Sequence, residues 1–342
     1  MKAENFTESK TLPFVSVIMP VRNEAGFITR SLDCVLDQDY PPERLEVIVA
    51  DGRSTDATRE LVESWQAEHP NLQLVDNPGQ IAPTGLNAAL ARARGEVIVR
   101  VDGHCEIAPD YVRNCVKHLR EDGVEGVGGP LETIGTTPMA EAIAAAMSSP
   151  FGVGGSAFRT VKDRTMLTDT VAFPAYTRAA IERAGLFDEE LVRNQDDEYN
   201  YRLRKLGGRI LLATDVQARY YSRSSLRSLF KQYFQYGYWK VRVLQKHPRQ
   251  MSLRQFIPPL FVASLVVALL LATLFAWGWL ILAAVGGSYL VANLMASLIT
   301  AARGNLRQLF LLPPVFLALH LSYGAGFLLG LVKFAPRWSD SK

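Results

Sequence analysis

Two long stretches without a charged side chain constrain this chain of 342 residues more than any other feature. Asp, Glu, Lys and Arg are all absent from Phe256 to Ala302, and again from Gln308 to Val332. Such runs match the roughly 20 residues that a helix needs to cross a bilayer. The sequence therefore predicts a transmembrane region over residues 256–332 with about three spans, at 257–276, 279–301 and 309–332. Pro313-Pro314 makes the last span irregular, either kinked or partly re-entrant.

The cations around these spans predict their orientation. No acidic residue lies between Asp215 and Asp340, and nine basic residues precede the first span: Arg219, Arg223, Arg227, Lys231, Lys240, Arg242, Lys246, Arg249 and Arg254. Lys and Arg next to a span favour the cytoplasmic side. We therefore expect a multi-pass protein of a bacterial-type inner (plasma) membrane, with everything before the first span in the cytoplasm. The tail over residues 333–342 is the exception, because three spans would place its basic residues outside.

Two further observations agree with a cytoplasmic N-terminal part. The polar segment over residues 1–13 has no apolar core of the kind that a secretory signal requires. The three cysteines, Cys34, Cys105 and Cys115, form no C-x-x-C pair and no disulfide pattern.

Residues 14–213 alternate between strand-like and helix-like patterns. Apolar runs at 15–19, 45–50, 72–75 and 97–101 are each followed by a helical pattern, over 25–37, 56–68, 83–94 and 109–121. This alternation predicts an α/β domain with a parallel sheet covered on both faces. Ligands of such sheets bind beyond the carboxyl ends of the strands. Neither G-x-G-x-x-G nor a Walker A pattern occurs there, which argues against those modes of dinucleotide or triphosphate binding.

The turn after the fourth predicted strand, Asp102-Gly103-His104, places a carboxylate and an imidazole on one bend. That pair is compatible with half of a divalent metal site. The alternative is an ordinary turn that carries a surface histidine.

Two helical segments follow the predicted sheet. Asp196 and Asp197 lie at the start of a helix that Gly207-Gly208 ends, so they are either functional carboxylates or residues that favour a helix N-terminus. Residues 225–246 form a basic, aromatic-rich amphipathic helix, and within the segment 223–255 it is expected to lie at the membrane interface. An ordinary domain-capping helix is the alternative. Nucleic-acid binding is not expected, because that would need a basic face away from the bilayer.

Seven motifs occur in an order that resembles a known family. They are Val17-Ile-Met-Pro-Val-Arg-Asn-Glu24, Asp51-Gly-Arg-Ser-Thr-Asp56, Gly85-Leu-Asn87 before Ala93-Arg-Gly-Glu96, Asp102-Gly-His104, Gly185-Leu-Phe-Asp188, Asn194-Gln-Asp-Asp-Glu198 leading to Arg202, and Gln235 to Trp239. Together they resemble family-2 inverting glycosyltransferases with a C-terminal membrane anchor, in particular exopolysaccharide β-glucosyltransferases of the succinoglycan type. The resemblance implies a GT-A fold over residues 14–222, with a Rossmann-like, mixed but mostly parallel sheet flanked by helices.

The resemblance also implies roles on the donor side. Pro20, Asn23 and Glu24 would lie at the nucleotide pocket, Asp51 would bind the uracil ring, and Asn87 would face the donor. Asp102 matches the first position of the family's D-x-D motif, which holds a divalent metal, Mn²⁺ or Mg²⁺, on the diphosphate. His104 replaces the second Asp of that motif, and imidazole is a competent ligand for Mn²⁺.

On the acceptor side, alignment of Glu198 and Arg202 with the family pattern makes Asp196 the catalytic base and places Asp197 at a variable position. Arg202, Gln235 and Trp239 would have secondary or acceptor roles. Processive members of the family carry a Q-x-x-R-W motif. In this chain Tyr238 stands where that motif has Arg, which argues against a processive synthase.

The chemistry supports the same assignment independently. Sugar transfer from a nucleotide diphosphate needs charge neutralisation on the leaving group and a carboxylate to accept the proton of the acceptor hydroxyl. Together with the resemblance, which implies the substrates, this chemistry predicts inverting transfer from a UDP-hexose such as UDP-glucose to a lipid-linked saccharide, with membrane lipids as further partners. A polyprenyl-phosphate sugar synthase is the first alternative; a processive synthase and an inactive assembly scaffold are less favoured.

Overall fold

Four apolar segments in the first hundred residues form the parallel part of the main sheet. The computed structural model describes residues 12–341, so most of the predicted tail 1–13, and Lys342, lie outside the described residues. The strands are β1 (Val15–Val21), β2 (Leu45–Asp51), β3 (Leu72–Asp76) and β4 (Val97–Arg100), and β1 pairs in parallel with both β2 and β4. The register aligns Val21 with Asp51 and Asp51 with Asp76, so the polar loops after these strands start at one edge of the sheet.

The full sheet is mixed, because one central strand runs against its neighbours. β9 (Ala172–Thr177) lies antiparallel between β4 and β6 (Gly126–Gly129), and the strand order is β3-β2-β1-β4-β9-β6-β10-β8. β8 and β10 are Met166–Leu167 and Ile210–Leu212. A second sheet has the order β5-β11-β7, with bounds Cys105–Ile107, Ala218–Tyr221 and Leu131–Ile134. This confirms the predicted fold class, a mostly parallel mixed sheet with flanking helices.

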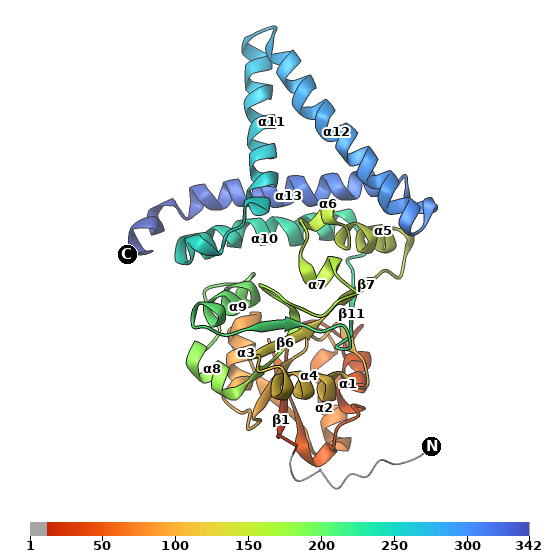
Figure 1. The fold of residues 1–342 in the computed structure, drawn as a ribbon, viewed down its shortest axis with the longest axis vertical. Coiled ribbons are helices and arrows are strands. Elements are labelled where there is room, and N and C mark those ends of the chain that lie inside the picture. Colours follow the sequence, from red (N-terminus) through yellow and green to blue (C-terminus); the bar gives the residue numbers. More distant parts are fainter. Residues whose placement is uncertain (1–11, 342) are drawn as a thin grey trace. The chain divides into compact units, whose positions relative to one another are not determined.

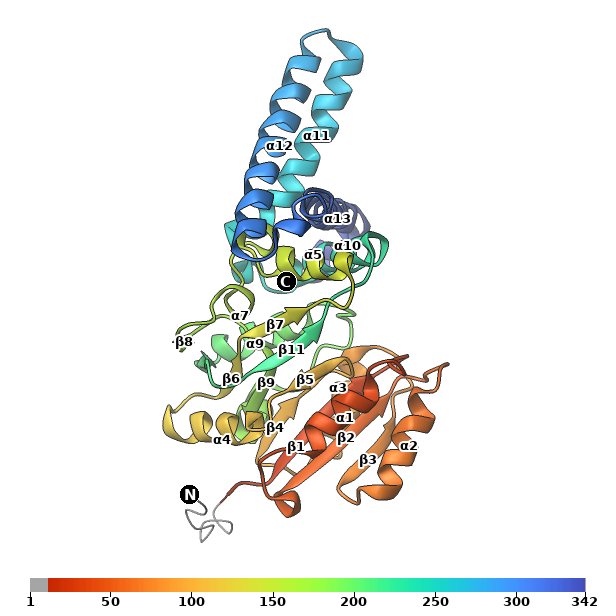
Figure 2. The same cartoon turned by 90° about the vertical axis from the view of Figure 1, so that its right-hand side faces the viewer.

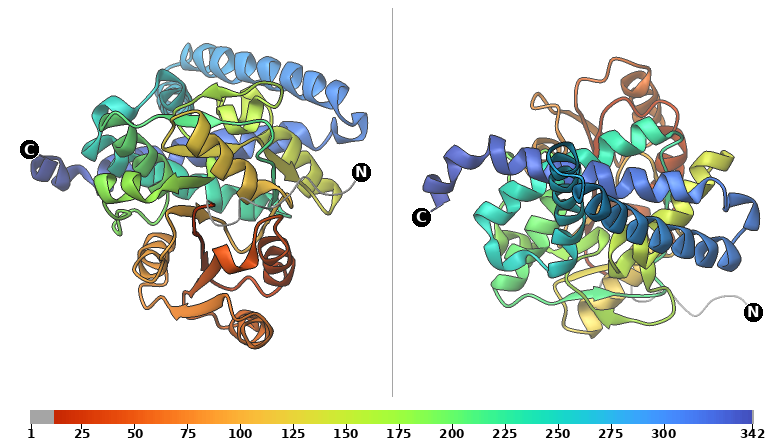
Figure 3. Two further views of the ribbon diagram at one scale, coloured as in Figure 1. Left: turned by 60° about the horizontal axis from the view of Figure 1, so that its bottom comes forward. Right: turned by 90° about the horizontal axis from the view of Figure 1, so that it is seen from above.

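Helices cover both faces of the sheet (Figure 3, left). They are α1 (Ile28–Leu36), α2 (Thr58–Glu68), α3 (Ala82–Leu90), α4 (Tyr111–Glu121), α8 (Arg178–Ala184) and α9 (Gln195–Lys205), with a short 3-10 turn at Pro42–Arg44. The first four match the predicted helical segments to within a few residues. Their apolar faces are buried: in α1, for example, Ile28, Leu32 and Val35 are fully covered.

A histidine on α4 ties that helix to the loop before β11. His118 Nδ1 lies 2.7 Å from an Asp122 carboxylate oxygen, and Nε2 lies 2.7 Å from one of Asp215. Burial alone would lower the pKa of His118, but the hydrogen bonds to these two carboxylates outweigh it and raise the pKa above its ordinary value of 6.5.

The chain divides into two units. One contains residues 1–132 and 161–220, and the other contains 133–160 and 221–342. Residues 133–160, which the sequence places within the catalytic domain, therefore group with the C-terminal helices. The physical reason is that their short apolar helices, α5 (Pro138–Met147) and α6 (Pro150–Val153), pack against the last long helix.

The second unit contains three helices that are long and apolar enough to cross a membrane. They are α11 (Ile257–Leu274), α12 (Gly278–Arg303) and α13 (Leu312–Lys333), and α11 and α12 form a hairpin (Figures 1 and 2). Pro313 and Pro314 lie in the first turn of α13. They therefore begin this helix instead of kinking it, because a first-turn proline has no intrahelical N–H bond to lose.

The amphipathic segment forms α10 (Leu226–Lys246), which begins at the N-cap Ser225. Helix α13 lies along its apolar stripe: Val241 packs with Phe327 and Phe334, and Gln245 Nε2 donates to the Phe334 carbonyl at 2.8 Å. The predicted location of α10 at the membrane interface stays a prediction. The remaining short helices of this unit are α7 (Ala157–Thr160) and 3-10 turns at Pro248–Gln250, Leu253–Phe256, Leu306–Gln308 and Ala335–Ser341.

Candidate active site

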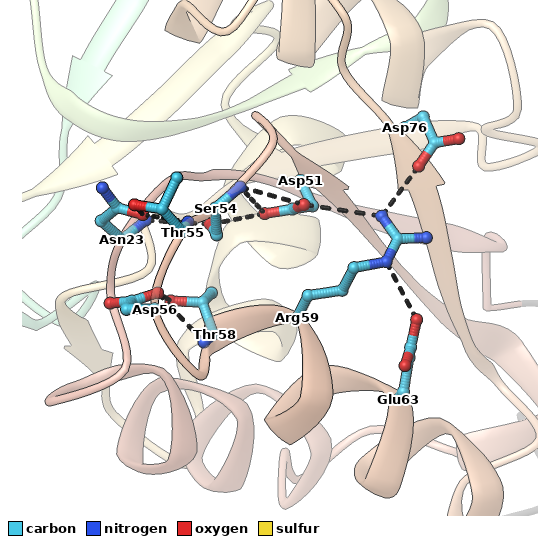
Figure 4. Close-up of polar contacts among 9 residues, drawn as sticks. All are labelled: Asn23, Asp51, Ser54, Thr55, Asp56, Thr58, Arg59, Glu63 and Asp76. Carbon is cyan, nitrogen blue, oxygen red and sulfur yellow. Dashed lines mark hydrogen bonds and ion pairs between the residues drawn. The ribbon is translucent and has the colours of Figure 1, made fainter.

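The loops after β1 and β2 are cross-linked by side-chain hydrogen bonds (Figure 4). Asn23, with a left-handed φ of 56°, accepts from the Thr55 amide at 2.8 Å through its side chain, and its own amide donates to Ser54 Oγ at 2.9 Å. Ser54 Oγ in turn donates to Asp51 at 2.6 Å. The two loops thus form one rigid rim beyond the carboxyl ends of the strands.

Asp51 is the buried charge of this rim. Its side chain is 1% exposed, and Arg59 Nη1 lies 3.5 Å from its second oxygen. Arg59 also pairs with Asp76 at 2.8 Å and with Glu63 at 2.9 Å (Figure 4). Pro20, one of the predicted pocket residues, lies near the end of β1. If Gly85 of α3 carried a Cβ, that atom would stand 3.1 Å from the Cβ of Pro20, so the strand and the helix are in contact there.

The bend Asp102-Gly103-His104 follows β4 and lies against the end of β1. If Gly103 carried a Cβ, that atom would stand 2.9 Å from Val21 Cγ1 and 3.2 Å from Glu24 Cγ, so any other residue would force these side chains to shift. On the other side, the Ser31 hydroxyl lies 3.0 Å from the Gly103 carbonyl. The predicted turn therefore has a fixed conformation.

His104 is held by a carboxylate. Its Nδ1 lies 2.9 Å from Glu24 Oε1, and its ring packs edge-on against Tyr220, with the centroids 5.2 Å apart. Because a carboxylate only accepts, Nδ1 carries the proton and the lone pair of the neutral ring is on Nε2. Glu24, predicted at the nucleotide pocket, thus contacts one of the two predicted metal ligands.

Arg100 brings together two carboxylates that are far apart in the sequence. Its Nη2 lies 2.8 Å from Asp102 Oδ1, and its Nη1 contacts Asp196 Oδ1. The side chain of Arg100 is 5% exposed, and those of Asp102 and Asp196 are 22% and 34% exposed. The predicted metal ligand and the predicted base therefore lie within reach of one guanidinium.

Sequence reasoning missed Arg100 because it lies in an apparently ordinary strand. A signal was present: Arg100 is the only charged residue between Val97 and Val101, and it stands two positions before Asp102. An arginine in a buried strand needs a partner close by.

Helix α9 presents Asp196 from a well-anchored start. Asn194 has a left-handed φ of 66° and the helix begins at Gln195. The Tyr176 hydroxyl on β9 hydrogen-bonds Asn200, and the Phe187 ring stacks on Tyr199 with the centroids 4.3 Å apart. The position of Asp196 is therefore set by the sheet and not by a loose loop.

Two predicted site residues are engaged in holding the neighbouring loop. Asn87 exchanges hydrogen bonds of 2.9 Å with the Phe187 backbone and also donates to Glu189. Arg202 pairs with Glu198 through two nitrogens, at 3.0 and 2.9 Å, and donates to the Leu186 carbonyl at 2.9 Å. That Asn87 contacts the sugar donor and that Arg202 acts on the acceptor side both stay predictions.

Gln235 and Trp239 belong to the second unit, on α10. Gln235 lines a cavity of about 740 Å³ together with Leu226, Arg227, Phe230, Lys231, Phe234 and Ala318. The Trp239 ring packs on Phe334, with the centroids 5.6 Å apart. Their predicted acceptor roles also stay predictions.

The donor set fits a divalent metal only in part. Among residues 12–341, no three His, Cys, Asp or Glu side chains gather as a metal site. That Asp102 and His104 are a pair of metal ligands stays a prediction; Glu24 holds His104 in the way that carboxylates commonly support metal-bound histidines. An ion that takes its other ligands from substrate phosphates and water needs no more than this.

Comparison with known proteins identifies relatives over the whole chain. Residues 16–185 match the family described as Glycosyl transferase family 2. The succinoglycan biosynthesis protein ExoA of Rhizobium meliloti (strain 1021) is 30% identical over 98% of this chain and 99% of its own length. A dolichyl N-acetyl-alpha-D-glucosaminyl phosphate 3-beta-D-2,3-diacetamido-2,3-dideoxy-beta-D-glucuronosyltransferase of Methanococcus voltae is 30% identical over 68% of this chain and 74% of its own.

Among solved structures, the mannosyltransferase PcManGT from Pyrobaculum calidifontis, in complex with GDP-Man and Mn²⁺, is similar in fold. It has a TM-score of 0.61 and 22% identity, and the match covers 94% of this chain and 88% of that one.

Proposed function

This chain belongs to glycosyltransferase family 2, and from that premise we propose that it transfers a hexose from a UDP-sugar such as UDP-glucose to a hydroxyl of a lipid-linked saccharide, with inversion at the anomeric carbon. The product contributes to an exopolysaccharide or another cell-surface glycan. The observation that carries the proposal is the Arg100 contact, because it places a diphosphate-side carboxylate, Asp102, and a candidate base, Asp196, around one point.

The first part of the site takes the donor. Asp51 is buried at the end of β2, and its carboxylate can accept a hydrogen bond from the N3–H of a uracil ring. Asn23 and Ser54 keep the rim around it rigid. A preformed pocket of this kind lowers the entropic cost of ordering the nucleoside.

The second part of the site takes the diphosphate. Asp102 and His104 would hold Mn²⁺ or Mg²⁺, which neutralises the negative charge that develops on the leaving diphosphate. Glu24 keeps the His104 ring oriented with Nε2 available. The close packing at Gly103 keeps the two ligands on one bend.

Asp196 acts on the acceptor. Its carboxylate accepts the proton of the acceptor hydroxyl while the hydroxyl oxygen bonds to the anomeric carbon and the bond to the diphosphate breaks on the opposite face. No residue of the protein has to bond to the sugar, so a single displacement inverts the configuration. In the absence of substrates, Arg100 offsets the repulsion between Asp196 and Asp102.

The relatives support a lipid-linked acceptor. The name of the Methanococcus voltae relative specifies a sugar transferred to a dolichyl-linked sugar phosphate, and that of the Rhizobium meliloti relative specifies succinoglycan synthesis. The long apolar helices of this chain would keep the enzyme beside such a substrate. We place its catalytic unit on the cytoplasmic face, because nine Lys and Arg residues and no acidic residue lie between Asp215 and the first apolar helix.

A pair of variants tests the assignment. Membranes with Asp196→Asn or Asp197→Asn are offered a panel of nucleotide sugars, and released nucleotide is scored with and without a lipid extract. Asp196→Asn should lower transfer by about 10²-fold or more, which is the usual contribution of a general base, while UDP binding stays unchanged. Asp197→Asn is the matched control, with the same change in charge one position away.

Each unfavourable outcome has a distinct meaning. Loss of transfer in Asp197→Asn but not in Asp196→Asn would move the base by one residue. Full transfer in Asp196→Asn would favour a polyprenyl-phosphate acceptor, because a phosphate is already ionised and needs no base. No nucleotide release with any donor would contradict the proposed activity.

A further inference from the structure

Helix α13 is about as apolar as α11 and α12, but its surroundings differ. In its apolar window 44% of the residues are buried, against 17% for the segment of α11 and 11% for α12. Large side chains of the hairpin are exposed instead, among them Leu270 on α11 and Leu294 on α12. Figures 1 and 2 show the hairpin projecting away from α13, which lies beside α10.

The backbones of α13 and α10 come close together at two glycines of α13. A Cβ on Gly326 would stand 2.1 Å from the Phe234 carbonyl oxygen, and one on Gly330 would stand 2.7 Å from that of Tyr238. Both pairs advance by four residues in the same direction. The two helices are therefore parallel neighbours over at least one full turn.

Helix α10 is charged along its whole length. Five of its residues are basic: Arg227, Lys231, Lys240, Arg242 and Lys246. If α13 crossed the bilayer, α10 would enter the hydrocarbon beside it, and charged side chains are costly there. Lys240 and Arg242 are buried against the protein, but Arg227 and Lys231 are exposed, and at the membrane surface they can reach lipid phosphates.

On another side, α13 contacts a segment that is also unsuited to the hydrocarbon. His320 Nε2 donates to the Phe151 carbonyl of α6 at 2.9 Å. Helix α6 has only four residues and continues into Gly154 and Gly155, which both have positive φ, and Arg254 donates to their carbonyls at 3.1 and 2.9 Å. Irregular backbone with exposed polar groups does not occur in contact with lipid tails.

We propose that α13 rests with α10 in the headgroup layer of the membrane, and that the chain crosses the bilayer only twice, through α11 and α12. The platform formed by α10 and α13 binds the lipid surface, and the hairpin provides the anchor. This goes beyond the transferase activity and does not depend on it.

Two crossings also remove the conflict in the charge pattern. They place Arg254, Arg303, Arg307, Lys333 and Arg337 on one side of the membrane, in agreement with the preference of basic residues for the cytoplasm. Three crossings would place Lys333 and Arg337 on the opposite side.

Depth measurements test the orientation of α13 in the full-length protein. Spin labels are attached at Leu317→Cys or Leu329→Cys, both exposed on α13, in lipid vesicles, and their depth is measured by collision with oxygen and with a water-soluble nickel complex. If α13 lies in the headgroup layer, the two depths agree to within a few ångströms. If it crosses the membrane, twelve residues of helix separate them by about 18 Å. Leu280→Cys and Leu294→Cys on α12 are the matched control, for which a difference of about 21 Å is expected.

Sidedness gives an independent readout that does not need α13 itself to be labelled. In a background without Cys34, single cysteines at Lys10, Ala276 and Ser341 are treated with a membrane-impermeant maleimide, before and after lysis of spheroplasts. Ser341→Cys should react under the same condition as Lys10→Cys and opposite to Ala276→Cys in the hairpin turn. Reaction together with Ala276→Cys, or a large depth difference along α13, would overturn the proposal.

Discussion

Replacing Arg100 by methionine should destabilise the protein strongly, because it removes the positive charge that two carboxylates share. Arg100 is the buried partner of both Asp102 and Asp196. Removal of one member of a buried ion pair costs about 3–5 kcal/mol. The two carboxylates here are 22% and 34% exposed, so water solvates part of the stranded charge. We therefore expect a loss of about 2 kcal/mol, which corresponds to a fall in Tm of about 4–8 °C for a unit of this size.

The assay is thermal unfolding of the full-length protein in detergent micelles, with a matched arginine as control. Arg219 Nε pairs with Glu132 at 2.9 Å, and these two side chains are 60% and 54% exposed. Arg219→Met should therefore cost about 1 kcal/mol or less. The comparison separates loss of a buried ion pair from loss of a surface one.

A double variant tests the reason for the effect. Adding Asp196→Asn to Arg100→Met neutralises one of the stranded carboxylates, so it should restore part of the lost Tm. Equal melting of Arg100→Met and Arg219→Met, or a further fall in the double variant, would refute the explanation by unpaired buried charge.

Three further outcomes follow from other contacts. Glu24→Gln should weaken Mn²⁺-dependent UDP binding about tenfold and His104→Ala at least as much, measured by calorimetry, whereas unchanged affinity in both would remove the histidine from the site. Gly326→Ala should lower Tm, because overpacking against a backbone oxygen costs about 1–3 kcal/mol. In the control Gly286→Ala the new Cβ has no atom within 4 Å, so Tm should stay unchanged or rise. Equal effects of the two variants would contradict the close contact between α10 and α13. The pKa of His118 is raised on folding above its ordinary value of 6.5. Its contribution to stability is therefore complete below its unfolded pKa and is lost as the pH rises through its folded pKa. The Tm advantage of wild type over His118→Gln should shrink as the pH rises above 6.5, and a constant advantage would contradict this explanation.

The parallel part of the sheet could be predicted because its signals are local. Each of the first four strands contains apolar residues, chiefly Val, Ile and Leu, and each is followed by a helical pattern. The central strand β9 carries no such signal: Ala172–Thr177 contains a proline and two alanines. Its pairing with β4 and β6 comes from contacts distant in the sequence, which local propensity does not contain.

The candidate site was predictable in its residues but not in its connections. Asp102, His104 and Asp196 stand in recognisable motifs, whereas the Arg100 contact to Asp196 joins positions 96 residues apart. Composition alone also gives no reason to separate α13 from the hairpin helices. The difference lies in Gly326 and Gly330, whose spacing matches the carbonyls of α10 only once both helices are placed.

The pairing of α10 with α13 also has a consequence for biosynthesis. Gln245 and Phe334, which are hydrogen-bonded, are 89 positions apart, so at about 5–20 residues per second the ribosome needs several seconds to make the partner of α10. On the proposed topology the hairpin α11–α12 would enter the membrane during that time, while the apolar stripe of α10 around Val241 would lack its cover by α13. Helix α13 therefore completes the packing around α10 last. A nascent chain that stops after α12 would insert its anchor but leave this stripe open to chaperones and proteases.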